Sequence, residues 1–326
     1  MDPSWNNIKL PGHLRNQFRE QFEQLASDHL LPVDDQHSEV TVPDIFKAFD
    51  LADKHIGLHW PFLAPNLWKY GSHILFSAYF ETSGTIADAM RGLLSTSTAL
   101  YPVFSATPEM TPTGLLMRSR PTYPMDPRHW EIFQTLSLLT QTAMLKKFAP
   151  DETKGMVYNF VAPENAFSET LRGVATCKVN FGVPLEGLYH EYPLELLQKK
   201  ISHKQIALNK VLYAELERQT ALPIPEDNLF NDLNKGIYAR FPELMPAEDA
   251  AQFLKMSRST FQRMLKRRGV RYTDILNALR REYILIYLSK ADPGGGHHIA
   301  LGFKTPRALR DYCRTHFGAP LTKLLS

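Results

Sequence analysis

The sequence predicts two domains: a mixed α/β or α+β amino-terminal domain and an all-α carboxy-terminal domain. Three observations lead to this prediction. The chain has 326 residues, more than twice the roughly 150 residues of an average domain. Apolar residues recur at both helical and strand-like spacings in the front part, and at helical spacings near the end. Positive charge is concentrated at the end, where residues 236–326 carry 16 basic and 7 acidic side chains, against 37 and 34 in the whole chain.

The front part is predicted to contain helices and short strands. Apolar residues recur at helical spacing in residues 85–104 and again in residues 130–148. Residues 156–162 and 177–181 alternate between apolar and polar side chains, as half-buried strands do. Many of the 23 prolines fall between residues 32 and 125, so we expect frequent loops there.

A domain boundary is expected after a third helix. Residues 204–218 carry apolar side chains at helical spacing, and the segment ALPIPEDN at residues 221–228 ends this helix with two prolines. We therefore predict an amino-terminal domain at residues 1–220, a linker at 221–235 and a carboxy-terminal domain at 236–326.

The carboxy-terminal domain begins with a pattern that predicts helix, turn and helix. Pro246 is placed to open a short helix, and Lys255 and Met256 are expected to form a tight turn. Ser257 is a natural N-cap for a second helix from residue 258 to 268, which Gly269 ends. A long helix is predicted at residues 272–290, and the residues after it leave room for a second unit of the same kind.

The second helix has two different faces. Phe261 and Leu265 lie on its apolar face, whereas Gln262, Arg263 and Lys266 lie on the other. Arginine can donate two hydrogen bonds to guanine, glutamine can pair with adenine, and lysine can meet phosphate. The concentrated positive charge also suits a polyanion. The alternative interpretation is an ordinary amphipathic helix whose polar face is solvated.

Residues 236–326 resemble the AraC/XylS family of bacterial transcription regulators, in which a long helix joins two helix-turn-helix units. The resemblance rests on Ala250 and Ala251 followed by MSRSTFQRMLKRRG, on LGF at residues 301–303, and on an FGxP ending at residues 317–320. It departs from the family at the Gly294–Gly296 run, where each glycine disfavours a helix by roughly 1 kcal/mol. It departs again at Asp311, where a basic residue is common.

The resemblance and the chemistry of the side chains together assign the residues that would contact double-stranded DNA. The base readers are Ser259, Gln262 and Arg263. The contacts to the DNA backbone are Lys255, Arg258, Lys266, Arg267, Arg307 and Arg310.

The front region also resembles the amino-terminal domain of ornithine-utilisation and virulence regulators. The similarity rests on DKHIGLHW at residues 53–60, TIADAMRGL at 85–93, VYNFVAP at 157–163 and NFGVPLEGLY at 180–189. It implies that this domain binds a small effector or mediates dimerisation. The resemblance to this family also implies an activator that works with RNA polymerase as a homodimer. The first residues hold Asp2 and mix polar with apolar side chains, without the apolar core of a signal peptide, so we expect a cytoplasmic protein. A regulator controlled by a protein partner, with no small ligand, remains the alternative.

Other classes of function find little support in the sequence. No Walker loop, dinucleotide fingerprint, HExxH or GxSxG motif is present, so we predict no enzyme and no cofactor. An enzyme with an appended DNA-binding module is the remaining enzymatic alternative. The histidines at positions 55, 59 and 190 lack the spacing of a metal site, and no apolar run reaches the roughly 18 residues of a membrane span.

Overall fold

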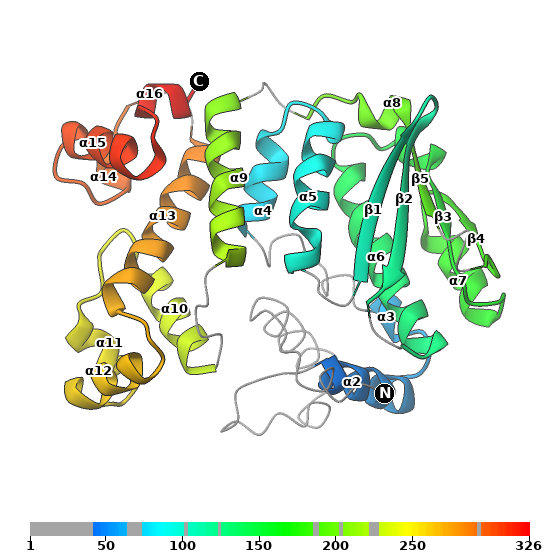
Figure 1. Ribbon diagram of the computed structural model, residues 1–326, viewed down its shortest axis with the longest axis horizontal. Helices are drawn as coiled ribbons and strands as arrows, with labels where there is room; N and C mark the ends of the chain where they lie inside the picture. Colours follow the sequence, from blue (N-terminus) through cyan, green and yellow to red (C-terminus); the bar gives the residue numbers. More distant parts are fainter. Residues whose placement is uncertain are drawn as a thin grey trace. The chain divides into compact units, whose positions relative to one another are not determined.

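The computed structural model describes residues 42–63, 74–100, 104–122, 125–184, 189–201, 205–221, 228–291 and 295–326. The chain divides into two compact units (Figure 1). The first unit contains the residues up to His73 and residues Gly84–Ile201. The second unit contains Ile74–Ser83 and Ser202–Ser326.

The first unit combines helices with one sheet. Its described helices are α2 (Val42–His55), α3 (Trp60–Leu63), α5 (Ile86–Leu100), α6 (Pro127–Lys146), the 3-10 helix η3 (Glu152–Gly155), α7 (Ala166–Val174) and α8 (Leu194–Leu197). Its strands are β1 (Phe104–Thr111), β2 (Gly114–Pro121), β3 (Val157–Asn159), β4 (Lys178–Asn180) and β5 (Tyr189–Pro193). This architecture confirms the prediction of a mixed α/β front part.

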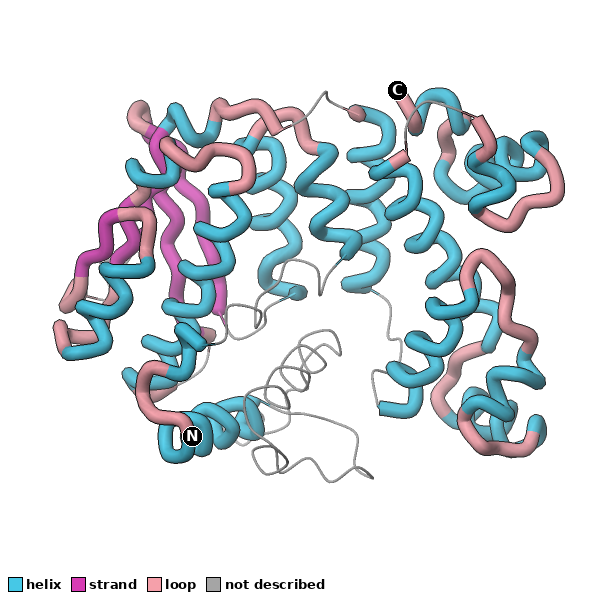
Figure 2. Tube along the Cα trace, turned by 180° about the vertical axis from the view of Figure 1, so that it is seen from behind, coloured by secondary structure: helices cyan, strands magenta, loops and turns pink. Residues whose placement is uncertain are grey.

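The five strands are ordered β1-β2-β5-β3-β4. Neighbours are antiparallel except β3 and β4, which run parallel and are connected through α7, because parallel strands need a crossover. Helix α6 lies over one face of the sheet (Figure 2). There Gln134 Nε2 donates to the carbonyl oxygen of Asn159 (2.9 Å), and the Tyr192 hydroxyl donates to Gln141.

The predicted elements of this unit form with shifted ends, and one pair of strands was not predicted. Helix α6 begins at Pro127, three residues before the predicted start, because Asp126 caps it by accepting from His129 N–H (2.9 Å). Strands β3 and β4 lie inside the two predicted strands. The β1–β2 hairpin stands where loops were expected. Pro108 is tolerated in β1 because β1 is an edge strand.

The described residues of the second unit contain helices and connecting turns only. The helices are α4 (Ile74–Thr82), α9 (Ile206–Ala221), α10 (Asn228–Arg240), α11 (Ala247–Phe253), α12 (Arg258–Arg267), α13 (Tyr272–Lys290), α14 (His297–Ala300), α15 (Pro306–Phe317) and α16 (Leu321–Leu324). We call α11 and α12 the first helix pair, and α14 and α15 the second helix pair. Figure 1 shows α13 running from the first pair to the second.

The compact units differ from the predicted domain limits at two places. Helix α9 packs with α4 and α13, so it belongs to the second unit although residues up to 220 were assigned to the front domain. Helix α10 occupies part of the predicted linker at 221–235. Its Leu233 and Ile237 are fully buried in the core that holds the first helix pair, which a linker could not provide.

The second helix pair approaches the loop after α10 very closely at Gly302. This residue has φ +70°, and a Cβ built on it would lie 2.7 Å from the carbonyl oxygen of Pro242. The glycine of the LGF motif is therefore required both by its backbone conformation and by the space around it. Gly318 has a similar φ of +64°, but a Cβ there would meet nothing within 4 Å.

Gly302→Ala should destabilise the protein more than Gly318→Ala. Both substitutions place a side chain in the left-handed region, at about 1–2 kcal/mol, and only the first adds the clash with Pro242, about 1–3 kcal/mol more. Urea denaturation of both variants measures the difference in the free energy of unfolding. Equal losses would show that Pro242 yields without cost.

The buried His190 predicts a pH dependence of stability. Its ring stacks on Tyr158 with centroids 3.5 Å apart, Asn159 N–H donates to its Nδ1 (3.4 Å), and burial lowers its pKa from 6.5 to about 3. Between these two pH values the unfolded chain binds a proton that the folded chain excludes. The stability contributed by neutral His190 is thus present above pH 6.5 and is lost as the pH falls toward 3.

We expect His190→Phe to flatten the acid branch of the stability profile. The wild-type free energy of unfolding should fall by about 1.4 kcal/mol per pH unit more steeply than that of the variant below pH 6.5. Phenylalanine keeps the ring stack, so the variant is suited to the comparison. Denaturation at a series of pH values measures both slopes, and parallel profiles would contradict a neutral, buried His190.

Candidate nucleic-acid interface

Helix α12 is fixed at both ends by local hydrogen bonds. Ser257 Oγ accepts from Thr260 N–H (3.2 Å) and caps the start of the helix. At its end Gly269 has φ +68°, and Val270 N–H donates to the carbonyl oxygen of Leu265 (3.2 Å). Both predicted caps are confirmed, and together they define a helix of under three turns.

The turn between α11 and α12 is also held by the backbone. Met256 N–H donates to the carbonyl oxygen of Ala251 (2.8 Å), and Lys255 N–H donates to that of Gln252 (2.9 Å). Lys255 has φ +55°, a conformation that non-glycine residues seldom adopt. The turn therefore requires Lys255, a cationic residue, to adopt a backbone conformation that glycine adopts more readily.

One face of α12 is buried in a core shared by four helices. Phe261 is fully buried and Leu265 is nearly so, and they pack with Ala250, Ala251 and Ile275. The Phe261 ring also meets the Tyr272 ring edge-on, with centroids 5.6 Å apart. This packing fixes the rotation of α12 about its axis and so determines which side chains face solvent.

The three predicted base readers lie on the exposed face of α12. Ser259, Gln262 and Arg263 are all solvent-exposed. Ser259 Oγ lies 3.0 Å from Ser257 Oγ, so it takes part in the cap region. Within the described part of the chain, no hydrogen bond or ion pair joins the side chain of Gln262 or Arg263 to another residue, which leaves their side-chain donors available to a ligand.

The predicted backbone contacts of the first helix pair surround this face. Lys255, Lys266 and Arg267 are exposed. Arg258 is exposed as well, but its Nη1 forms an ion pair with Glu248 Oε1 (2.7 Å). A phosphate would have to compete with this carboxylate for Arg258, whereas the other three cations meet no such competitor among the described residues.

The second helix pair has a shorter first helix than the first pair, and its second helix carries an acidic residue, Asp311, on its exposed face. Helix α14 spans four residues, as expected from the glycines before it. Helix α15 is capped by Thr305, whose Oγ1 accepts from Ala308 N–H (3.2 Å). Arg307 is exposed and lies 3.7 Å from Asp311 (Nε to Oδ2), and Arg310 is exposed without a described partner.

The sequence assignment missed one further cation on α15. Arg314 is exposed and follows Arg310 by four positions and Arg307 by seven, so the three arginines share one face of the helix. The helical spacing of these arginines was visible in the sequence and would have found Arg314. The opposite face, with Leu309, is buried.

The two cysteines offer no nucleophile. Burial raises the pKa of the Cys177 thiol to about 11 and that of the Cys313 thiol to about 12. Because the thiolate is the reactive form, both are unreactive near neutral pH. They are packed side chains, with Cys313 fully buried on the apolar face of α15.

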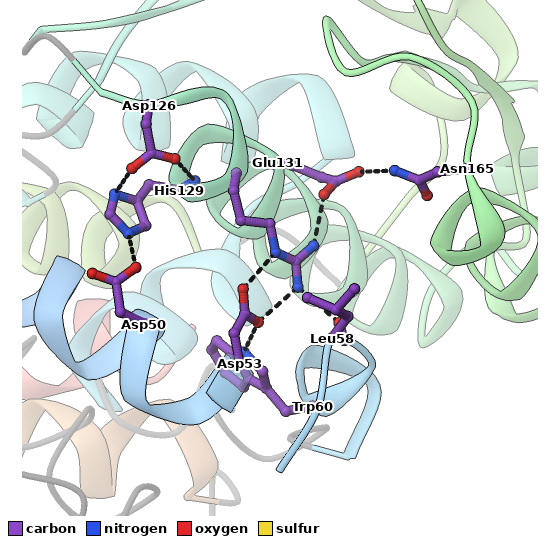
Figure 3. Close-up of polar contacts among 9 residues, drawn as sticks. Asp50, Asp53, Leu58, Trp60, Asp126, His129, Glu131 and Asn165 are labelled. Carbon is purple, nitrogen blue, oxygen red and sulfur yellow. Dashed lines mark hydrogen bonds and ion pairs between the residues drawn. The ribbon is translucent and has the colours of Figure 1, made fainter. Parts of the chain in front are cut away.

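A cluster of charged residues in the first unit joins α2 to the start of α6 (Figure 3). Arg128 donates through Nε and Nη2 to Asp53 (2.8 Å each), through Nη1 to Glu131 (2.6 Å), and through Nη2 to the carbonyl oxygen of Leu58 (2.8 Å). Trp60 Nε1 also donates to Asp53 (2.9 Å). Each nitrogen of the Arg128 guanidinium and both oxygens of Asp53 thus meet an internal partner.

His129 extends the cluster beside Arg128. Its Nε2 lies 2.9 Å from Asp50 Oδ1 and its Nδ1 lies 2.5 Å from Asp126 Oδ2 (Figure 3). Its ring also stacks on that of Phe46. No group of histidine, cysteine, aspartate and glutamate among the described residues is arranged to hold a metal ion. The cluster is best explained as a set of hydrogen bonds and ion pairs that holds α2 against α6.

The histidines considered in the sequence have separate surroundings. His190 is a core residue, whereas His55 and His59 are exposed. The described helices also include none that is both long enough and apolar enough to span a bilayer.

Comparison with known proteins shows similarity to a transcriptional regulator. The chain is 27% identical over 191 residues to the HTH-type transcriptional regulator VirS of Mycobacterium tuberculosis, in two strains. The aligned region covers 56% of this chain and 53% of VirS, so the chain spans about half the length of the curated relatives it matches. No model of a known protein family matches the chain.

Among solved structures, the crystal structure of the transcriptional regulator CdpR from Pseudomonas aeruginosa is similar over 97% of this chain and 98% of its own. The TM-score is 0.43 and the sequence identity 14%. In sequence, the chain is similar to a protein named as an HTH-type transcriptional regulator.

Proposed function

We propose that the chain is a sequence-specific, DNA-binding transcription regulator of the AraC/XylS type, in which both helix pairs act as helix-turn-helix units. The observation that carries this proposal is the exposed face of α12. Gln262 and Arg263 project from a capped and packed helix and meet no internal partner in the described part of the chain. The name of the relative, an HTH-type transcriptional regulator, supports the same class.

The reading face would work because it is preorganised. Helix α12 is narrow enough to enter the major groove, where Arg263 can bond both acceptors of guanine and Gln262 can pair with adenine. Ser259 can bond either kind of base edge. Lys255, Lys266 and Arg267 would contact phosphates and release counterions, which adds affinity for any DNA sequence.

The second helix pair would mainly contact the DNA backbone. Its exposed Arg307, Arg310 and Arg314 favour phosphates, while Asp311 repels phosphate and can accept a hydrogen bond only from a base such as cytosine. Helix α13, with 19 residues, is about 28 Å long. Successive major grooves lie about 34 Å apart, so a helix of this length is suited to join two readers on one face of DNA.

The first unit is proposed to sense a small effector in the cytoplasm and to mediate dimerisation, so that the regulator can activate RNA polymerase. Its core contains buried polar atoms that have no hydrogen-bond partner among the described residues: Gln134 Oε1, Thr135 Oγ1 and His190 Nε2. Leaving such atoms unpaired costs free energy. A small polar ligand that supplies their partners would therefore bind with a direct gain in stability.

Arg263→Ala should weaken binding to the preferred duplex by about 1–3 kcal/mol and relax the base preference at one position. Lys266→Ala should instead weaken binding to all sequences alike and lower the salt dependence. Arg91, an exposed arginine of α5, provides the control substitution. Titration of specific and random duplexes by fluorescence anisotropy separates these outcomes. Equal losses on both duplexes for Arg263→Ala would refute its role as a base reader.

Effector sensing predicts that small molecules change DNA binding. The purified full chain should select different amounts of DNA from a random library with and without a protein-free metabolite extract. Gln134→Leu should abolish this response while DNA binding persists, and the exposed Gln198→Leu should preserve it. A response that appears only when protein is left in the extract would favour control by a protein partner.

A further inference from the structure

Glu215 of α9 is a buried carboxylate that neutralises two arginines. Its side chain is fully buried. Arg218 Nε donates to both carboxylate oxygens (3.0 Å each), and Arg281 of α13 donates to Oε2 through Nε (3.1 Å) and Nη2 (2.8 Å). Because Arg218 lies on the same helix as Glu215, Arg281 is the partner that joins α9 to α13.

The contact between Glu215 and Arg281 has a defined geometry. A carboxylate removed from water is tolerated only when cations and hydrogen-bond donors replace its hydration. Two donors from one guanidinium also fix the direction of approach, which a single point charge would not. Arg281 is thus held at one position rather than left to sample the surface.

Arg281 and its neighbour Arg280 also hold the second helix pair. The Arg281 guanidinium carbon lies 5.6 Å from the ring centroid of Phe317, at the end of α15. That of Arg280 lies 4.5 Å from the Phe303 centroid and 5.2 Å from the Tyr312 centroid. These cation–π contacts attach α15 to the middle of α13.

The start of α13 holds the first helix pair through different residues. Phe261 and Leu265 of α12 pack with Ile275 and Tyr272 at the start of α13, in a core that includes neither Glu215 nor Arg281. The two helix pairs therefore contact α13 through separate residues, and the second pair also lies against Pro242 in the loop after α10. Of these contacts, only those made by Arg281 involve α9.

Helix α9 is itself fixed to α4. Asn209 Nδ2 lies within hydrogen-bond distance of three oxygens at the end of α4: the carbonyl of Tyr79 (2.9 Å), Oγ1 of Thr82 (3.1 Å) and Oγ of Ser83 (3.1 Å). Helices α4, α9 and α13 pack together in the second unit. The order of contacts therefore runs from α4 through Asn209 and Glu215 to Arg281 and the second helix pair.

We infer that Glu215 is a positioning residue for DNA binding: by holding Arg281, it fixes the orientation of the second helix pair relative to the first and so the spacing of the two half-sites. This inference rests on the proposed function. Glu215 touches no DNA in this scheme and acts only through Arg281. Its loss should therefore alter which spacing is bound, and should spare the affinity of the first helix pair for its own half-site.

The test uses the full chain and duplexes selected from a random library by the wild type. One duplex carries the two half-sites that the wild type protects in footprinting. A second duplex carries only the half-site of the first helix pair. In a further series of duplexes, the distance between the two half-sites is increased by one or more base pairs. Glu215→Gln is compared with Glu217→Gln, which removes the same charge from the exposed face of α9. Circular dichroism and thermal melting establish that each variant is folded.

We expect Glu215→Gln to bind the two-site duplex roughly 10- to 100-fold more weakly than wild type, because a linked second site adds affinity only when both can engage together. It should also lose the preference for one spacing and bind the single half-site as wild type does. Glu217→Gln should behave as wild type on every duplex. If Glu215→Gln does not fold, Arg281→Met, which leaves Glu215 with Arg218, provides the same comparison.

The possible results distinguish the positioning role of Glu215 from the proposed regulator function. A folded variant that keeps the wild-type spacing preference would overturn the positioning role while the regulator function stands. A variant that loses the single half-site and the two-site duplex equally would show a general structural role, which also overturns it. A wild-type protein that binds no duplex at all would instead remove the proposed function.

Discussion

The second unit depends on the burial of apolar side chains around α13. The helices of the two pairs have between 4 and 12 residues, and isolated helices shorter than about 12 residues are marginal in water. Their stability must come from packing. Ile275 near the start of α13 packs in the core of the first helix pair, and Leu285 and Leu288 farther along α13 are buried as well. The polar faces of α12 and α15 remain exposed because their opposite, apolar faces are buried.

The charges around the exposed faces of α12 and α15 differ in how cations are paired with carboxylates. The carboxy-terminal residues 236–326 carry an excess of positive charge, but two carboxylates stand beside cations that DNA would require: Glu248 beside Arg258, and Asp311 beside Arg307. Both ion pairs are solvent-exposed, and each typically contributes less than 1 kcal/mol to stability. Under the proposed function, phosphates would displace these carboxylates at small cost, and base reading would fall to Gln262 and Arg263.

The sequence predicted those parts of the fold that depend on neighbouring residues. Ser257 and Gly269 define the ends of α12, and the residue range of α13 follows from its apolar spacing, because capping and periodicity are local properties. The β1–β2 hairpin was missed because an edge strand tolerates proline and exposed polar residues, which resemble a loop. The pairing of Glu215 with Arg281 joins residues 66 positions apart. No local sequence pattern reveals this pairing. Without it, α9 was assigned to the front domain.

The path of the chain connects this pairing to the first unit. Helix α4 is flanked on both sides by residues of the first unit, and α9 follows the point where the chain leaves that unit after Ile201. Ile201 N–H donates to the carbonyl oxygen of Gly84 (3.1 Å), so one backbone contact of the first unit joins a residue shortly after α4 to a residue shortly before α9 along the chain. A coupling between two sites needs an element on which both act. If the first unit senses an effector as proposed, the covalent connections through Gly84 and Ile201 are a route by which the chain itself would carry the signal toward α4 and α9.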